Sequence, residues 1–265
     1  MENYPRLVEV VNISKSSLYY ESKKDIKDQK LKLEIENVLS EFPSYGHRRI
    51  ALHLKRNKKA ILRVMNKFAI KPYRRKRKPW KKAKQEEEQA LKNLIKDIII
   101  YKRNQVWVTD FTYIWFKNRF IYLATVMDRY TREIVGASVL AHHNTSLVLQ
   151  ALTSALMNNS KPEIIHQDQG SEYTAELFQD FCSSSGIKTS YSKKGSPWEN
   201  AFQESFYDKF KIDFGDANRF ETLGELVYEI HRQIYVYNHK RIHLVLKMPP
   251  VEFAKLKNSF HTSAL

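Results

Sequence analysis

The sequence predicts a two-part protein, in which a small all-helical module precedes an α/β domain built on a mixed five-stranded sheet. Three observations predict this arrangement. Before residue 70, apolar residues recur at helical spacing. From Gln105 onward, aromatic and β-branched residues alternate with polar ones, a pattern typical of strands. Three expected strands in hairpin order then precede a helix, a strand, a helix and a strand, which indicates both antiparallel and parallel pairing.

The first part of the chain, residues 1–70, is expected to be a helix-turn-helix-like DNA-binding module. Leu52 and Leu62 belong to the apolar faces that we expect to be buried there. Arg48 and Arg49 follow a turn and begin a helix, which suits contact with phosphates, although an ordinary bundle with a basic exposed face explains them equally well. The expected helices cover residues 6–20 (two short helices), 28–42, 47–55 and 58–68.

The net charge of +16 is confined to the front of the chain. Residues 1–104 contain 28 Lys and Arg against 12 Asp and Glu, whereas residues 105–265 contain 17 of each. A segregated positive segment favours a polyanion partner, most simply nucleic acid. The alternative is a lysine-rich helical region whose charges only contact water.

A basic run separates the two expected domains. Nine of the fourteen residues from 71 to 84 are Lys or Arg, so the run cannot bury itself and is interpreted as a linker or arm. Residues 85–103 are expected to form a lead-in helix, which completes a linker of residues 71–104. A localisation signal or a plain spacer is the alternative interpretation. The candidate DNA contacts here are phosphate-binding cations and one stacking aromatic ring: Arg74, Arg75, Lys76, Arg77, Lys78 and Trp80.

The second part is expected to contain an α/β domain over residues 105–225 and a helical segment over 226–265. Its helices are expected at 144–157, at 174–185 and from Pro197 onward. Its strands are expected at 106–116, 120–127, 133–140, 163–166 and 188–191.

Three carboxylates of this domain are candidate catalytic and metal-binding groups. Asp110 interrupts an apolar strand, where a carboxylate costs free energy unless it is paired or binds a cation. Asp168 follows the fourth strand, and Glu204 lies on the last helix of the domain. Oxygen ligands on two strands and a helix suit Mg²⁺ (or Mn²⁺). Each residue alone is more often structural, and Asp128 and Asp213 are interpreted as turn or edge residues.

The helix that carries Glu204 has a clear start signal. Ser196 and Glu199 have the spacing of a capping box, which gives Glu199 a structural role and leaves Glu204 as the third carboxylate. Asn200 and Lys211 lie on the same helical face as Glu204, at four residues before it and seven after it. Both are candidate DNA contacts.

Other features narrow the class of protein. The single cysteine excludes a disulfide framework and a zinc site built on several cysteines. No apolar run approaches the ~20 residues needed to span a bilayer, and the start has no signal-peptide pattern. We therefore expect no membrane partner and a cytoplasmic, nucleoid-associated location.

Several segments also resemble a known family. WVTDFTYI, HQDQGSEY and GSPWENAFQESFYDKFK resemble the D,D(35)E signature of the integrase catalytic core, and 35 residues separate Asp168 from Glu204. YGHRRI, ILRVMNKF and IYVYNHKRIHLVLKMPPVEF extend this similarity, which is strongest to OrfB-type transposases of bacterial insertion sequences. The chain departs from the family pattern at Gln167 and between Arg56 and Lys58, where its helical module is shortened.

The resemblance implies an RNase H-like fold and a two-step reaction, in which an element end is cleaved and its 3′-OH then attacks target DNA. Asp110, Asp168 and Glu204 would bind metal, with two ions ~3.5–4 Å apart expected from such chemistry. Lys211 would contact DNA. The implied partners are the element's terminal repeats, target DNA, further copies of the chain and a protein from an upstream frame. A DNA-binding regulator or partner-dependent subunit inactive alone, and an RNase H-like nuclease outside transposition, are the alternatives.

Replacing the five basic residues at 74–78 by alanine is expected to flatten the salt dependence of DNA binding, because each lost phosphate contact reduces the log–log slope by about 0.9. The measurement is a binding titration at several salt concentrations. Alanine replacements of Lys161 and Lys188, in the charge-balanced half, serve as the control. An unchanged slope in the 74–78 variant would refute the proposed phosphate contacts.

Overall fold

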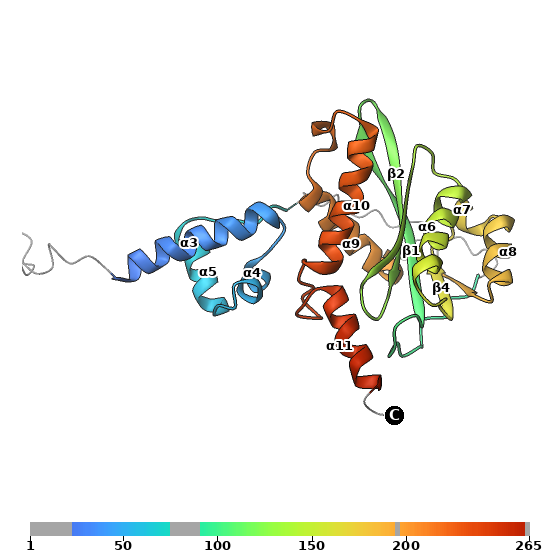
Figure 1. Ribbon diagram of the computed structural model, residues 1–265, viewed down its shortest axis with the longest axis horizontal. Coiled ribbons are helices and arrows are strands. Elements are labelled where there is room, and N and C mark those ends of the chain that lie inside the picture. The colour runs from blue at the N-terminus through green and yellow to red at the C-terminus, as the bar shows by residue number, and fades with distance from the viewer. Residues whose placement is uncertain (1–22, 75–90, 194–196, 263–265) are drawn as a thin grey trace, which may run out of the picture. The chain divides into compact units, whose positions relative to one another are not determined.

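The computed structural model describes residues 23–74, 91–193 and 197–262. The chain divides into two compact units, residues 1–41 with 45–72 and residues 42–44 with 73–265 (Figure 1). The helix pair expected within residues 6–20 lies outside the described residues, as does most of the basic run. The elements are α3 (Lys23–Glu41), α4 (His47–His53), α5 (Lys58–Lys67), β1 (Val106–Phe116), β2 (Arg119–Asp128), β3 (Ile134–Leu140), α6 (Thr145–Asn158), β4 (Ile164–Gln167), α7 (Ser171–Thr174), α8 (Glu176–Ser184), β5 (Lys188–Tyr191), the 3₁₀ turns η1 (Pro197–Asn200) and η2 (Ala217–Arg219), α9 (Ala201–Phe214), α10 (Leu223–His239) and α11 (Pro250–Thr262).

The smaller unit contains the helices α3, α4 and α5. An ion pair joins α3 to α5: the buried Asp28 of α3 accepts two hydrogen bonds of 2.6 Å from Arg63 of α5. The expectation that Leu52 and Leu62 are buried is wrong, because both are exposed. Leu52 lies two residues after the buried Ile50, and residues two apart point to different sides of a helix.

The larger unit contains the expected mixed five-stranded sheet, in the order β3-β2-β1-β4-β5. β1 pairs with β2 and β2 with β3 in antiparallel fashion, whereas β4 pairs with β1 and with β5 in parallel fashion. In the described chain, β4 pairs with β1 only along Val106–Val108. The remainder of β1 therefore projects beyond the end of β4, and this projection begins beside Asp110.

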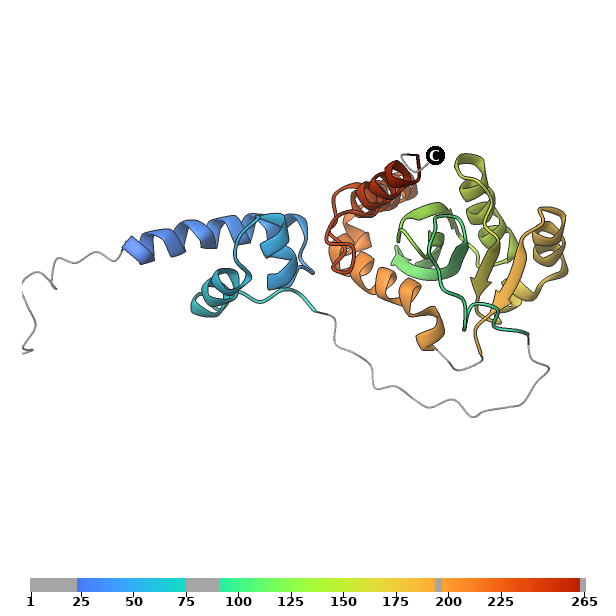
Figure 2. The same cartoon turned by 90° about the horizontal axis from the view of Figure 1, so that it is seen from below.

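Helices cover both faces of the sheet (Figure 2). α9 and α10 pack on one face, where Val108 and Leu123 meet Phe206 and Phe210. α6, α7 and α8 pack on the other face, around Trp107. Successive strand side chains point to opposite faces, so this alternation explains the pattern of the sequence. Among the described residues, none of the helices has the length and apolar composition to span a membrane.

Three expected helices differ from those observed. Residues 91–103 contain turns instead of the lead-in helix, because their backbone bonds to the sheet: Lys92 accepts from Tyr191 and Leu94 donates to Ser190. The helix expected at 174–185 corresponds to α8, which begins only at Glu176, because the non-helical backbone of Ala175 separates it from the short α7. The last expected helix opens with the 3₁₀ turn η1.

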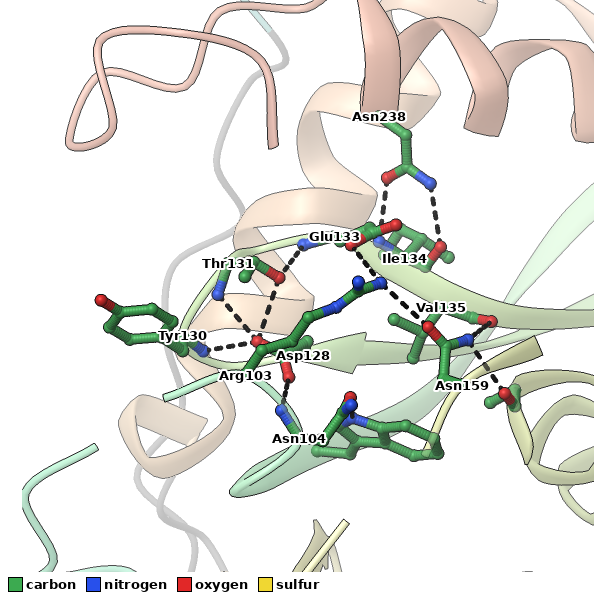
Figure 3. A network of polar contacts seen from close by, with 12 residues as sticks. Arg103, Asn104, Asp128, Tyr130, Thr131, Glu133, Ile134, Val135, Asn159 and Asn238 are labelled. Carbon is green, nitrogen blue, oxygen red and sulfur yellow. Dashed lines mark hydrogen bonds and ion pairs between the residues drawn. The ribbon is translucent and has the colours of Figure 1, made fainter. Parts of the chain in front are cut away.

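The helix α10 is anchored to the sheet by a polar network (Figure 3). Asn238 accepts a hydrogen bond from the Ile134 N–H and donates one to the Ile134 carbonyl, both at 2.9 Å. In the same network, Asp128 ends β2 and accepts the N–H groups of Tyr130 and Thr131, so its expected turn role is confirmed.

Asp213 is not the turn or edge residue that the sequence suggested. It lies in α9 at 1% side-chain exposure and pairs with Arg241 at 2.8 Å. It also accepts the N–H of Ser44, and Arg241 donates to the Ser44 hydroxyl. The ion pair therefore joins the segment after α10 to the end of α9.

Arg241→Met is expected to lower the free energy of unfolding by about 3–5 kcal/mol, because it leaves the buried Asp213 carboxylate without its cation. The matched control is Arg232→Met, which removes a half-exposed pair with Glu229 and should cost at most about 1 kcal/mol. Urea unfolding measures both changes. Equal losses in the two variants would contradict the structural role of Arg241.

Candidate active site

Asp110 lies in the middle of β1, on the sheet face that α9 covers. It is half-buried, and its Oδ1 accepts the N–H of Phe111 at 2.8 Å. It follows the last residue pair between β1 and β4 by two residues. Its carboxylate is therefore held by a rigid strand at the point where the sheet opens.

Asp168 directly follows β4 and lies at the surface. Its Oδ1 accepts the N–H of Gly170 at 2.9 Å, which closes a tight turn. A Cβ on residue 170 would approach that Oδ1 to 3.0 Å and an Oε2 of Glu172 to 3.2 Å, so glycine leaves room for two acidic groups. The neighbouring Glu172 is paired with His143 at 2.7 Å.

Glu204 is exposed in the first turn of α9, and two buried neighbours fix the position of that helix. Gln203 donates from Nε2 to the carbonyls of Val108 and Thr125, at 2.8 and 3.2 Å. The hydroxyl of Tyr207 donates to the carbonyl of Asp110 at 2.6 Å. These bonds hold Glu204 beside β1.

Sequence reasoning missed Gln203 and Tyr207. A signal for both was present in the sequence. Gln203 and Tyr207 are four residues apart and therefore share a face of the helix. Their polar groups stand out there, because most other buried residues of α9 are phenylalanines. The capping box expected between Ser196 and Glu199 lies outside the described residues, because Ser196 does. Glu199 nevertheless has a structural role. It accepts the N–H of Lys193 at 2.7 Å and the amide of Asn93 at 2.9 Å, and so ties η1 to earlier segments.

Two of the carboxylates, Asp168 and Glu204, act electrostatically on the third, Asp110. Burial, followed by the charge of Asp168 and a smaller effect of Glu204, raises the pKa of Asp110 to about 7, whereas the Phe111 N–H and Lys211 oppose the shift. Loss of surrounding water also raises the pKa of Asp168 and that of Glu204. The site thus concentrates negative charge that a bound cation would relieve.

Oxygen-only donors of this kind fit a hard divalent cation such as Mg²⁺. Across residues 23–74, 91–193 and 197–262, however, no three acidic, His or Cys side chains are already close enough together to hold an ion. Binding would therefore require the carboxylates to approach one another. Such tightening is common when a site first meets its ligand.

The residues predicted to contact DNA differ in how exposed they are in the structure. Lys211 is half-buried, and its Nζ lies 4.7 Å from the centre of the Tyr113 ring. Arg48 is exposed, while Arg49 packs over Tyr45. Asn200 is only 6% exposed, which leaves its side chain little surface for DNA. Arg74 is exposed, and the remaining candidates lie outside the described residues: Arg75, Lys76, Arg77, Lys78 and Trp80.

Comparison with known proteins places these features in a family. Residues 101–197 and 185–250 each match a family model described as an integrase core domain. A putative transposase of insertion sequence element IS150 from Escherichia coli is 30% identical over 265 residues, covering 94% of this chain and 93% of its own length. A transposase of IS904 from Lactococcus lactis is 38% identical over 157 residues, covering 57% and 62% of the two chains.

The fold is also similar to that of a solved viral protein. A chain of the simian T-cell lymphotropic virus intasome, solved in complex with the PP2A regulatory subunit B56 gamma, aligns with 82% of this chain and 70% of its own, with a TM-score of 0.50 and 16% identity. This likeness agrees with the RNase H-like arrangement of strands and helices that the sequence predicts.

Asp110→Asn is expected to stabilise the metal-free protein at pH 8 but not at pH 4. A folded pKa of about 7, above the ordinary 3.8, means that ionisation costs stability progressively as pH rises between these values. The full shift corresponds to about 4 kcal/mol, and partial contact with water makes about 2 kcal/mol the expected gain. Denaturant unfolding at both pH values measures it. An equal effect at both would contradict a raised pKa.

Proposed function

This chain belongs to the family of insertion-sequence transposases that carry an integrase core domain, and we propose that it cleaves element ends and joins the freed 3′-OH to target DNA. The observation that supports this best is the placement of three carboxylates on neighbouring elements. They come from the middle of β1, the end of β4 and the first turn of α9, and burial, followed by the charges of Asp168 and Glu204, raises the pKa of Asp110. Such a charge cluster beside an open strand edge suits phosphoryl transfer.

We propose that Asp110, Asp168 and Glu204 bind Mg²⁺ or Mn²⁺, with two ions as the expected number. When bound, the ions would activate the attacking oxygen and stabilise charge on the leaving oxygen. The donor set fits this role, because carboxylate oxygens are the preferred ligands of these ions. Their positive charge would also offset the burial and the repulsion by Asp168 and Glu204 that raise the pKa of Asp110.

The protein's own groups would orient the reacting DNA. Asp110 is fixed by its strand and by the Phe111 N–H, and Asp168 by the Gly170 N–H. Lys211 already acts electrostatically on Asp110, so its cation would lie near the phosphate being cut. No proton-transferring His is needed for this arrangement. A stable position of α9, and hence of Glu204, sets the third corner of the site.

The partners follow from the charge distribution and the family. The basic excess of residues 1–104 favours contact with the terminal repeats and target DNA, while the charge-balanced remainder carries the chemistry. We propose that several copies assemble on DNA to hold two ends together, and that a protein from an upstream frame assists end recognition. Its DNA substrate would place the assembly at the nucleoid.

Glu204→Gln is expected to lower cleavage and strand transfer by about a hundredfold or more, because several kcal/mol of charge stabilisation depend on such ligands. The assay incubates the purified chain with oligonucleotides of the element's terminal repeats and Mg²⁺ or Mn²⁺. Glu176→Gln is the matched control, since Glu176 is also exposed in the first turn of a helix, α8.

The outcomes separate the candidate functions. Equal activity of wild type and Glu204→Gln would refute the assignment of the third carboxylate. DNA binding without cleavage by the wild type would favour a regulator or a partner-dependent subunit. Cleavage without any joining would favour a nuclease that acts outside transposition.

A further inference from the structure

Three aromatic rings are exposed together at the end of the β1–β2 hairpin. Tyr113, Trp115 and Phe120 are 57%, 49% and 43% exposed. Phe120 meets both other rings edge-on, with centroids 5.1 Å from Tyr113 and 4.8 Å from Trp115. We call these three rings the aromatic shelf. Clustered exposed aromatic surface of this kind is typical of a binding site.

The aromatic shelf belongs to the part of β1 that projects beyond β4. Tyr113 and Trp115 are two residues apart on one strand, so they share a face, and Trp115 is paired across the hairpin with Phe120. The shelf borders a groove of about 590 Å³ that continues over the strand edge to Phe210 and Lys211 of α9. The rings and the helix therefore bound a single groove.

The groove has one cation in its lining and two more at the hairpin tip beside it. Lys211 lines the groove and lies over the Tyr113 ring, whereas Lys117, which donates to the Glu221 carbonyl, and Arg119 are exposed at the tip. One acidic group, Asp216, also lines the groove, but its Oδ1 already accepts two hydrogen bonds from Asn218, at 3.0 and 3.1 Å. Rings beside cations suit a nucleotide, because bases stack on the rings while phosphates bind the cations.

The distance between Asp110 and the aromatic shelf indicates how far from the reacting phosphate a nucleotide on the shelf would lie. At about 3.3 Å per residue, Tyr113 lies about 10 Å along β1 from Asp110, and Trp115 about 17 Å. Both rings leave the strand on the face opposite to Asp110, so a nucleotide would reach them where the groove passes over the strand edge. That span is comparable to one or a few nucleotides. A paired base cannot offer its face to a protein ring, so the occupant must be unpaired.

We propose that the aromatic shelf stacks an unpaired base of the DNA strand next to the phosphate that is cut. The inference rests on the proposed transposase function and adds a subsite to it. Stacking on a ring tolerates any base, so the subsite would favour single-stranded or distorted DNA without reading its sequence. It would hold the strand after it leaves the carboxylates.

The test compares two DNA probes in the absence of divalent metal, so that no cleavage occurs. One is a duplex with a short unpaired thymidine tail, and the other is the same duplex with an abasic tail. The wild type is expected to bind the thymidine tail about tenfold more tightly, as stacking on one ring would give. Trp115→Ala should abolish this preference and leave the affinity for a blunt duplex unchanged.

Two further variants make the result decisive. Trp115→Phe keeps a ring and should retain part of the preference, which a merely structural role would not explain. Tyr228→Ala removes a ring on α10 that is even more exposed, at 70%, and should retain all of the preference. No preference in the wild type, or a full preference in Trp115→Ala, would overturn the proposal.

Sedimentation of the same variants addresses the other possible occupant. If Trp115→Ala changed only the oligomeric state and kept the tail preference, the shelf would be an interface between copies and the proposal would be wrong. A separate failure of the transposase function would be recognised differently. The wild type would then keep its tail preference but release no product from terminal-repeat DNA with Mg²⁺.

Discussion

The attachment of α9 to the sheet by Gln203 and Tyr207 is the constraint on which the site depends. Apolar contacts among Phe206, Phe210 and the sheet hold the helix against β1, but such contacts have no direction and would tolerate small slides and rotations. The hydrogen bonds of Gln203 and Tyr207 to strand carbonyls do have direction, and they are buried. Leaving one such group unsatisfied costs about 1–3 kcal/mol. They therefore fix the rotation of α9, and with it the direction of Glu204.

The C-terminal segment supports the same helix from the other side. Arg241 pairs with Asp213 near the end of α9, and Asn238 bonds the backbone of Ile134 at the start of β3. Asn238 and Arg241 both lie in the C-terminal segment IYVYNHKRIHLVLKMPPVEF. This segment follows the three carboxylates in the sequence and also resembles insertion-sequence transposases. The contacts of these two residues give that resemblance a physical meaning, because they hold in place α9 and β3, two elements of the domain that carries the proposed site.

Sequence reasoning succeeded where local pattern decides structure. The bounds of β1 and β5 were predicted to the residue, since period-2 alternation and β-branched residues mark strands directly. It failed where distant contacts decide. Residues 91–103 bond to β5 and so form no helix, and the break at Ala175 has no Gly or Pro to announce it. The three carboxylates stay a prediction from residue type and spacing. Gln203 was not predicted, because its partners are backbone carbonyls far away in the sequence.

Because β4 pairs with only a short part of β1, the rest of β1 has an exposed edge. Asp110 and the rings of Tyr113 and Trp115 all lie on this exposed part of the strand. A strand edge without a neighbour exposes backbone groups that can pair with other chains, and proteins usually protect such edges. Here η2 shields the far end of β1, where Asn218 accepts the Lys117 N–H at 2.9 Å. Between Asp110 and that point the edge remains open to a groove. A polymer substrate needs such a surface, because the nucleotides on both sides of the reacting phosphate must lie somewhere. In the proposed function, the open edge that exposes Asp110 would thus also provide a path for the strand beyond it.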